Sequence, residues 1–523
     1  MPLISLHDMK KSYGDQVLLD IDHLAIHKGD RIGLVGSNGS GKTTLLRILA
    51  GDLDPDHGSV YKETSVSVLP QLKQTSENKS GGEVTADYII DSLNQTTELL
   101  LADEPTTHLD MSHIEWVEKA FQQFQGSFVV ISHDRNFLDR VCQTIWELDD
   151  KKIVPYSGNY TTYKQEKEKE KQHQQTEYER YIKKSKQLVE AKEKKAKQAE
   201  DMLKVKHIQG GKVVYTESSS DFYQAKAKKL HRVQKSMESR LERLEKVDKP
   251  KEIEQVKMSL PNMDRIHKQF IIRGFNIEGE VPNKLLWKPA TITVKGGEKI
   301  GLIGPNGSGK TTLIRKIINE NETFTLSPAM KIGYFSQDLS VLDTEKTVLE
   351  NVSEASVQTE TLIRIILGQL KFKGNDVYKK VSVLSGGERV KVSLAKLLAG
   401  NYNTLILDEP TNFLDIQAVE ALETLLKQYD GTIILISHDR SFVSAIVEKL
   451  WILENEELLE FTGSYSEWEQ REIKASMTNS EEELMRLEND IVKILSELSL
   501  SPSEEKDKQF QRLLEKKRSL QKK

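Results

Sequence analysis

Short runs of branched apolar residues recur along the chain, and each run leads into a glycine, an acid or a histidine. Three such runs occupy residues 31–36, 99–103 and 129–132, and similar runs return at 299–304, 405–408 and 434–437. Strands that are buried on both faces of a parallel sheet have continuous apolar runs rather than alternating ones. We therefore expect an α/β fold with buried parallel strands, and a helix that starts at Lys42 and again at Lys310.

The middle of the chain has a different pattern, in which charged residues dominate. Residues 164–206 are rich in Lys, Glu, Gln and Ala and contain no Pro or Gly, which predicts one long solvated helix. Gly210 and Gly211 break this helix, and a second charged helix is expected from about residue 222 to 247. The two helices would form a hairpin whose apical segment is apolar and aromatic.

An internal repeat organises the whole chain. K-S-G-G-E, L-A-D-E-P-T and I-S-H-D-R in the first half return as L-S-G-G-E, I-L-D-E-P-T and I-S-H-D-R, and all three pairs are offset by 305 residues. The glycine-rich motifs at 36–43 and 304–311 are offset by only 268 residues, so the first half is shorter between its motifs. Most of the loss follows Gln71 and Gln337, where the second half has room for a small helical subdomain.

These boundaries predict four parts of the chain. They are a first α/β domain with a shortened helical subdomain (1–163), a charged helical linker (164–263), a second α/β domain (264–471) and a helical C-terminal extension (472–523). The extension could pack on itself or contact a partner.

Composition excludes several classes of protein. No apolar run approaches the length of a membrane-spanning helix, and residues 1–11 lack a signal-peptide pattern, so we expect a cytoplasmic protein. Cys142 is the single cysteine, which excludes an intramolecular disulfide, and we expect it to be a small buried apolar residue. Residues 161–260 carry a net charge of +9, whereas the rest carries −14. This asymmetry predicts that the central segment meets a polyanion.

The glycine-rich motifs have the strand, loop and helix context of a P-loop. Glycines free backbone N–H groups to surround phosphates, and the helix N-terminus adds positive potential. Lys42 and Lys310 should reach the β- and γ-phosphates, and Thr43 and Thr311 should bind Mg²⁺. The predicted nucleotide-binding residues are Gly36, Ser37, Asn38, Gly39, Ser40, Gly41, Lys42, Thr43 and Thr44, and then Gly304, Pro305, Asn306, Gly307, Ser308, Gly309, Lys310, Thr311 and Thr312.

Acidic residues end the next apolar run of each half. Asp103 and Asp408 are expected at the carboxyl end of a buried strand, where such an acid helps to hold Mg²⁺. The adjacent Glu104 and Glu409 are placed to polarise an attacking water molecule, as a general base does.

A histidine stands 30 residues after each of these aspartates. His133 and His438 end the third apolar run, where they could contact the γ-phosphate. A lone histidine is more often structural, but the repeated spacing favours a functional role.

With these motifs the chain resembles the ATP-binding-cassette family, whose S-G-G-E signature occurs in no other common P-loop class. The resemblance implies two ATP molecules, each with Mg²⁺ and each lying between one P-loop and the signature of the other domain. Asp110 and Asp415 would cross the interface between the domains. The first site would add Gln71 and the opposite Ser385, Gly386 and Gly387, and the second would add Gln337 and the opposite Ser80, Gly81 and Gly82, with both glutamines near Mg²⁺.

Two features depart from the family pattern. Tyr13 occupies the place where the family stacks an aromatic ring on adenine, but the aligned stretch of the second half, residues 274–287, offers Ile277 or Glu278 there, with only Phe275 nearby. Lys79 and Phe413 replace the usual Leu and His of their motifs, so the two sites could differ in turnover.

The linker has two possible interpretations, one purely structural and one functional. It could be a solvated antiparallel coiled coil, but residues 181–240 hold 16 basic and 7 acidic positions, which favours contact with RNA phosphates.

Paired cassettes joined by such a linker resemble the ABC-F class of ribosome-binding ATPases. The shortened first domain and the basic extension are similar to the Vga-type antibiotic-resistance proteins of that class. The resemblance implies that the protein binds the ribosomal exit site with linker 164–263 near 23S rRNA and the exit-site or peptidyl-site tRNA. It also implies displacement of lincosamide, streptogramin A and pleuromutilin antibiotics, a monomer with intramolecular cassette pairing, and neither DNA nor a membrane subunit as a partner.

Two alternatives remain open. A housekeeping ABC-F translation factor would share every motif and differ mainly at the linker apex. The ATPase subunit of a transporter would need the helical subdomain that the first domain has mostly lost.

Overall fold

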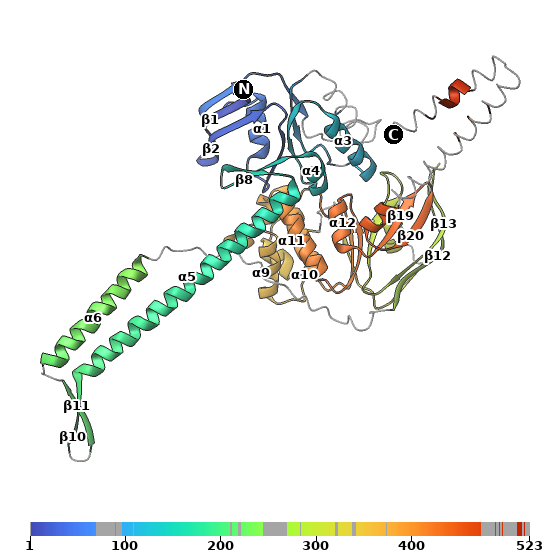
Figure 1. Ribbon diagram of the computed structural model, residues 1–523. Coiled ribbons are helices and arrows are strands. Elements are labelled where there is room, and N and C mark those ends of the chain that lie inside the picture. The colour runs from blue at the N-terminus through green and yellow to red at the C-terminus, as the bar shows by residue number, and fades with distance from the viewer. Residues whose placement is uncertain are drawn as a thin grey trace. The chain divides into compact units, whose positions relative to one another are not determined.

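The structure is a computed structural model in two compact units, Met1–Tyr156 with Gln255–Lys523, and Ser157–Glu254 (Figure 1). It describes residues 2–69, 89, 97–107, 109–209, 212–217, 221–243, 269–282, 284–319, 323–336, 341–372, 374–471, 487, 491, 494, 510–514 and 517. The predicted C-terminal extension therefore lies almost entirely outside the described residues.

The first cassette is built on a six-stranded sheet with the order β5-β6-β7-β3-β8-β9, in which β3 is parallel to both β7 and β8. A three-stranded antiparallel sheet, β2-β1-β4, accompanies it. The elements are β1 (Pro2–Tyr13), β2 (Gln16–His27), β3 (Arg31–Gly36), α1 (Lys42–Ala50), β4 (His57–Lys62), β5 (Val66–Leu69), β6 (Leu99–Asp103), α3 (Met111–Gln123), β7 (Ser127–Ile131), α4 (Arg135–Val141), β8 (Thr144–Asp149) and β9 (Lys152–Ser157).

The second cassette repeats this plan with the strand order β16-β17-β18-β14-β19-β20 and the small sheet β13-β12-β15. It also contains the small helical subdomain predicted for this half, formed by α8, α9, η2 and η3. The elements are β12 (Phe270–Val281), β13 (Lys284–Lys295), β14 (Lys299–Ile303), α7 (Lys310–Asn319), β15 (Phe324–Leu326), β16 (Ile332–Phe335), α8 (Val348–Ser353), α9 (Glu360–Gln369), η2 (Gly374–Tyr378), η3 (Val381–Val383), α10 (Gly386–Ala399), β17 (Thr404–Asp408), α11 (Ile416–Lys427), β18 (Thr432–Ile436), α12 (Arg440–Ile446), β19 (Lys449–Glu454) and β20 (Glu457–Thr462).

The parallel register gathers the motif residues at one sheet edge. β6 pairs with β7 so that Asp103 lies opposite Ile131, and β3 pairs with β7 so that Leu34 lies opposite Ile131 as well. Because parallel strands end at the same edge, the P-loop, Asp103 and His133 leave the sheet together. The predicted α/β fold with buried parallel strands is confirmed.

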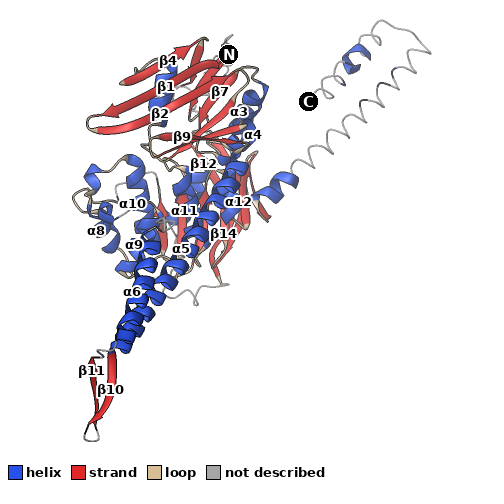
Figure 2. Ribbon diagram, turned by 60° about the vertical axis from the view of Figure 1, so that its left-hand side comes forward, coloured by secondary structure: helices blue, strands red, loops and turns tan. Residues whose placement is uncertain are grey.

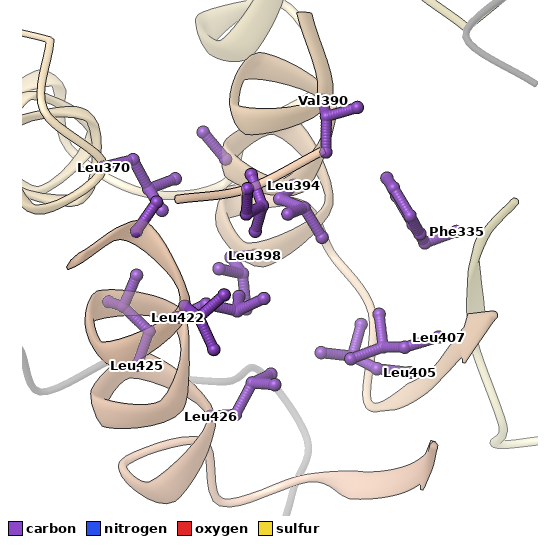
Figure 3. Packing of buried hydrophobic residues seen from close by; sticks show 14 of the residues in the cluster. Phe335, Leu370, Val390, Leu394, Leu398, Leu405, Leu407, Leu422, Leu425 and Leu426 are labelled. Carbon is purple, nitrogen blue, oxygen red and sulfur yellow. The ribbon is translucent and has the colours of Figure 1, made fainter. Parts of the chain in front are cut away.

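The core of the second cassette connects the elements that carry its motifs. Leu394 and Leu398 on α10 pack with Leu405 and Leu407 on β17 and with Leu422 on α11 (Figure 3). Each of these leucines is at most 1% exposed, so the region is closely packed and transmits displacement rather than absorbing it. The core therefore joins α10 to the strand that ends in Asp408.

The second unit is a helical hairpin with a β-hairpin at its apex, formed by α5 (Tyr160–Leu203), β10 (Lys204–Gln209), β11 (Lys212–Glu217) and α6 (Asp221–Glu242). Figure 2 shows α5 and α6 side by side, and Lys192 Nζ on α5 lies 2.6 Å from Glu238 Oε1 on α6. The predicted helical hairpin is confirmed. The prediction that the first helix reaches residue 206 is wrong, because its last residues pair with β11 instead. Branched residues on both sides of a Gly-Gly pair favour a β-hairpin over a helix.

Two predictions from composition can be compared with the structure. Cys142 is buried at 5% exposure, as predicted, and burial raises the pKa of its thiol. Within the described ranges, none of the helices has both the length and the apolar character needed to cross a membrane.

Candidate active site

The first P-loop joins β3 to α1 and folds around its own lysine. Lys42 Nζ donates hydrogen bonds to the carbonyl oxygens of Gly36 (2.8 Å) and Ser37 (3.0 Å). Gly41 has a φ of 106°, and a Cβ at this position would lie 2.9 Å from the Leu18 side chain. Only glycine suits both this backbone conformation and this space.

The second P-loop has the same geometry between β14 and α7. Lys310 Nζ donates to the carbonyl oxygens of Gly304 (2.8 Å) and Pro305 (2.9 Å). Burial lowers the pKa of Lys42 and of Lys310. An anion placed beside either ammonium group would stabilise its charged form.

A threonine and an aspartate meet beside each P-loop. Thr43 Oγ1 donates to Asp103 Oδ2 at 2.8 Å, and Thr311 Oγ1 donates to Asp408 Oδ2 at 3.2 Å. Burial raises the pKa of both aspartates. Hydroxyl and carboxylate oxygens suit Mg²⁺, which usually takes one or two carboxylates together with substrate phosphates. Among the residues that the structure describes, no group of three or more His, Cys, Asp or Glu could hold a metal by itself. Because Mg²⁺ commonly completes its coordination with substrate phosphates, each threonine–aspartate pair fits a Mg²⁺ ion that is bound together with a nucleotide.

Each glutamate that we expect to orient water lies against its histidine. His133 N donates to Glu104 Oε2 at 3.3 Å, and His133 Nε2 lies 3.3 Å from Glu104 Oε1. Both corresponding distances between His438 and Glu409 are 3.4 Å. Glu104 and Glu409 have φ values of 54° and 51°, and the Oε1 atom of each is buried without a hydrogen bond. Strained, unsatisfied groups of this kind cluster at functional sites.

Burial shifts these groups in opposite directions. It raises the pKa of Glu104 to about 8 and raises the pKa of Glu409 as well. It lowers the pKa of His133 to about 4 and that of His438 to about 3. The histidines are therefore neutral near pH 7, and the carboxyl groups titrate near the working pH, which suits a general base.

Acids at the N-termini of α3 and α11 reach the P-loop of the opposite cassette. Asp415 Oδ2 accepts a hydrogen bond from Asn38 N at 3.1 Å, and Asp110 Oδ2 accepts one from Asn306 N at 3.0 Å. Each acid also caps its own helix. The two cassettes are thus paired head to tail, with each P-loop against the other cassette.

The signature of the second cassette lies beside the first P-loop. Ser385 caps α10 in a capping box with Glu388. A Cβ on Gly387 would lie 2.7 Å from the Phe413 carbonyl oxygen of its own cassette, so glycine suits the close packing of the signature against that loop. The same Cβ would lie 3.5 Å from Asn38 Nδ2, which places the signature within contact distance of the first P-loop. Ser80, Gly81, Gly82, Gln71 and Gln337 lie outside the described residues.

A cavity of about 1180 Å³ lies between the cassettes. Its walls include Glu104 and His133 from the first cassette and Lys310, Thr311 and Glu409 from the second. Ligand pockets commonly measure about 300–1,000 Å³, so the space is ample for a nucleotide.

One serine hydroxyl group in each P-loop makes no hydrogen bond within the protein. The Oγ atoms of Ser40 and Ser308 are buried without a hydrogen bond. Buried hydroxyl groups are rarely left unpaired, and a phosphate oxygen would accept from them. The residues present therefore fit ATP and Mg²⁺.

The hairpin register corrects the sequence alignment at the adenine position. Tyr13 ends β1 at the tip of the β1–β2 hairpin and is 54% exposed. The equivalent tip of the second cassette pairs Val281 with Lys284, and both residues line the cavity. The alignment that offers Ile277 or Glu278 is wrong because β12 contains several register shifts, and Ile277 is fully buried in the core.

Sequence reasoning missed contacts that join the cassettes. Arg135 Nη1 lies 3.1 Å from Glu423 Oε2 on α11, and Arg440 Nη2 lies 3.4 Å from Glu118 Oε1 on α3. The repeated I-S-H-D-R motif contains both arginines, but a repeat does not reveal what its members contact.

Together the fold and the paired sites define an ATP-binding-cassette ATPase. The ABC transporter family model matches residues 19–78 and 287–412. The solved structure of an RNase-L Inhibitor superposes with a TM-score of 0.59 at 18% identity, covering 90% of this chain and 93% of that chain, which shows a shared fold.

Sequence relatives place the chain in a particular family of ATP-binding-cassette ATPases. The chain is 30% identical over 534 residues to the ribosome protection protein VmlR of Bacillus subtilis (strain 168), covering 96% of this chain and 95% of that protein. It is 31% identical to the erythromycin resistance ATP-binding protein MsrA of Staphylococcus epidermidis, covering 88% and 99%. It is 32% identical to the ATP-binding protein Uup of Buchnera aphidicola subsp. Acyrthosiphon pisum (strain APS), covering 87% and 81%. The chain belongs to the ABC-F family and is an ATPase.

Proposed function

We propose that this chain is an ATP-dependent ribosome-protection protein of the cytoplasm. It binds the ribosomal exit site, inserts its linker toward the peptidyl-transferase centre and displaces lincosamide, streptogramin A and pleuromutilin antibiotics. The observation that supports this most is similarity to VmlR, a protein named for ribosome protection, along 96% of the chain, linker included. MsrA, named for erythromycin resistance, supports the same class of function.

Two ATP molecules, each with Mg²⁺, bind between the cassettes in this proposal. The first site, which we call site 1, uses the P-loop at 36–44 with Glu104. Site 2 uses the P-loop at 304–312 with Glu409. The contacts of Asn38 with Asp415 and of Asn306 with Asp110 support this pairing, since each joins one P-loop to the opposite cassette. ATP bound at these two places would hold the cassettes together until hydrolysis.

The linker contacts RNA through its basic residues. Residues 181–240 have 16 basic and 7 acidic positions, and Lys183, Lys184 and Lys186 are exposed on α5. Phosphate contacts of this kind are salt-dependent. We therefore expect ribosome binding to weaken as the salt concentration rises.

Inhibitory concentrations test the proposal. The protein is expressed in a susceptible strain and assayed with the three proposed drug classes and with erythromycin. We expect raised inhibitory concentrations for at least one class, and no effect from a Glu104→Gln, Glu409→Gln control in which drug release cannot cycle with hydrolysis. Unchanged values for every class would contradict resistance.

A housekeeping ABC-F translation factor is the second candidate. The 32% identity to Uup favours this candidate, because the name of that protein mentions no drug resistance. Co-sedimentation with ribosomes together with unchanged inhibitory concentrations would favour this candidate. Co-sedimentation with membranes instead of ribosomes would favour a transporter ATPase.

A further inference from the structure

The acids that cross between the cassettes are held in two different ways. Asp415 and Asp110 occupy equivalent positions, since each caps its helix and accepts a backbone N–H from the opposite P-loop. Their remaining partners differ in charge, in origin and in the oxygen that they contact. The two ATP sites are therefore built unequally around the same bond.

At site 1 the acid is paired with a buried lysine of the signature helix. Lys391 on α10 lies with its Nζ 3.6 Å from Asp415 Oδ2, and the two side chains are 9% and 5% exposed. This is the same oxygen that accepts from Asn38 N. Although burial alone raises the pKa of Asp415, the Lys391 ammonium and the two backbone N–H donors bring it below its usual value. Lys391 therefore connects the signature helix, through Asp415, to the P-loop of site 1.

At site 2 the acid is held by its own helix. Asp110 Oδ1 accepts from Ser112 Oγ (2.7 Å) and His113 N (3.0 Å) and lies 2.6 Å from His113 Nδ1. Its other oxygen accepts from Asn306 N. Although burial alone raises the pKa of Asp110, hydrogen bonds from Asn306 and His113 bring it well below its usual range. Within the part of the chain that the structure describes, none of the partners of Asp110 comes from a signature helix; residues 79–88 of the first cassette lie outside that part.

The internal repeat shows that each half has an alanine at the position where the other half has its supporting side chain. At the constant offset of 305 residues, Lys391 corresponds to Ala86, and His113 corresponds to Ala418. Alanine offers neither charge nor hydrogen bond from its side chain, so neither cassette carries both devices. Among the described residues, each acid therefore has polar side-chain support that the other lacks.

We propose that Lys391 is a positioning residue for site 1 alone, and that His113 has the corresponding role at site 2. The inference rests on the proposed assignment of the two ATP sites. Without Lys391 the buried Asp415 carboxylate loses its ion-pair partner, and its bond to Asn38 then weakens. Site 1 then loses its link between signature and P-loop, whereas site 2 keeps its own support.

Single glutamate variants separate the two sites. In the Glu409→Gln background site 1 retains its glutamate, and in the Glu104→Gln background site 2 does. In the first background we expect Lys391→Met to lower kcat about tenfold with KM changed less than about twofold, because the bond acts on closure rather than on initial binding. In the second background it should leave kcat within about twofold. His113→Ala should show the opposite preference, with a smaller fall of about threefold, because Ser112 still holds Asp110.

Control variants distinguish positioning from folding. Lys391→Arg should restore kcat to within about twofold, because it returns a cation to the same place. Lys396→Met changes another lysine of α10, one that donates to the Val341 carbonyl oxygen, and should leave both backgrounds unchanged. Equal loss in both backgrounds, or no loss in either, would overturn the inference.

A second measurement does not depend on hydrolysis. In the Glu104→Gln, Glu409→Gln protein, nucleotide retained through gel filtration should fall from two per chain to one when Lys391→Met is added. Retention of two would also overturn the inference. These assays use the purified full chain without ribosomes, so failure of ribosome protection leaves their outcome intact, whereas undiminished hydrolysis in the double glutamine protein would refute the site assignment itself.

Discussion

Replacing Arg440 by methionine should lower the free energy of unfolding more than removing one partner of a shorter ion pair on the protein surface. The Arg440 and Glu118 side chains are each 3% exposed and lie 3.4 Å apart across the two cassettes. Lys346 and Glu354 lie only 2.6 Å apart, but they are 37% and 62% exposed. We expect the burial of an ion pair, rather than its N–O distance, to determine how much the pair contributes to the free energy of unfolding.

The loss of stability depends on whether the substitution leaves an unpaired charge buried. Removing one partner of a buried pair typically costs about 3–5 kcal/mol, because the other charge stays buried and unpaired. Glu118 keeps Arg140, whose Nη1 lies 2.7 Å away, so the loss should be nearer about 2 kcal/mol. An exposed pair contributes about 0–1 kcal/mol.

A double-mutant cycle measures this difference. Arg440→Met and Glu118→Gln are made singly and together, and the free energy of unfolding of the nucleotide-free protein is followed in urea. We expect a coupling energy of about 1–2 kcal/mol, larger than the coupling that the same cycle gives for Lys346 and Glu354. If the coupling of the buried pair does not exceed that of the exposed pair, the reasoning from burial fails.

Other properties of the sites can be tested directly. Glutamine at both Glu104 and Glu409 should lower hydrolysis by at least about a hundredfold while ATP binding, followed with a fluorescent analogue, stays within about twofold; full activity would refute the catalytic assignment. Cys142 should resist a thiol reagent until the protein is unfolded, because it is buried and burial raises the pKa of its thiol; rapid native labelling would show that it is accessible. Gly309→Ala should remove nucleotide from site 2, since its methyl group would lie 2.8 Å from Trp287; an unchanged stoichiometry would contradict this.

Motifs whose parts are contiguous in the sequence were predicted well. The strand, glycine-rich turn and helix of each P-loop follow one another directly, so local periodicity and the glycine requirement predict all three. The internal repeat then extends each prediction to the other cassette, at an offset of 268 residues for the P-loops and 305 residues for the three later motifs. Resemblance to a family, rather than spacing, was needed to expect that the cassettes pair head to tail.

Contacts between distant segments could not be predicted in detail. The bond from Asn38 to Asp415 joins residues 377 positions apart, and the bond from Asn306 to Asp110 joins residues 196 apart. Nothing in local pattern shows that Lys391 supports one acid while His113 supports the other. The adenine position was misplaced for a related reason, since the register shifts in β12 displace the hairpin tip relative to a simple alignment.

The left-handed backbone at Glu104 and Glu409 has a consequence for engineering. A side chain in this conformation costs of order 1–3 kcal/mol, and each carboxyl also keeps one oxygen buried and unbonded. Replacement by glycine would remove both the backbone strain and the unsatisfied carboxyl oxygen. Selection for thermal stability alone would therefore favour the loss of these two glutamates. A search for stabilising substitutions would therefore select the two positions at which we expect a substitution to abolish ATP hydrolysis.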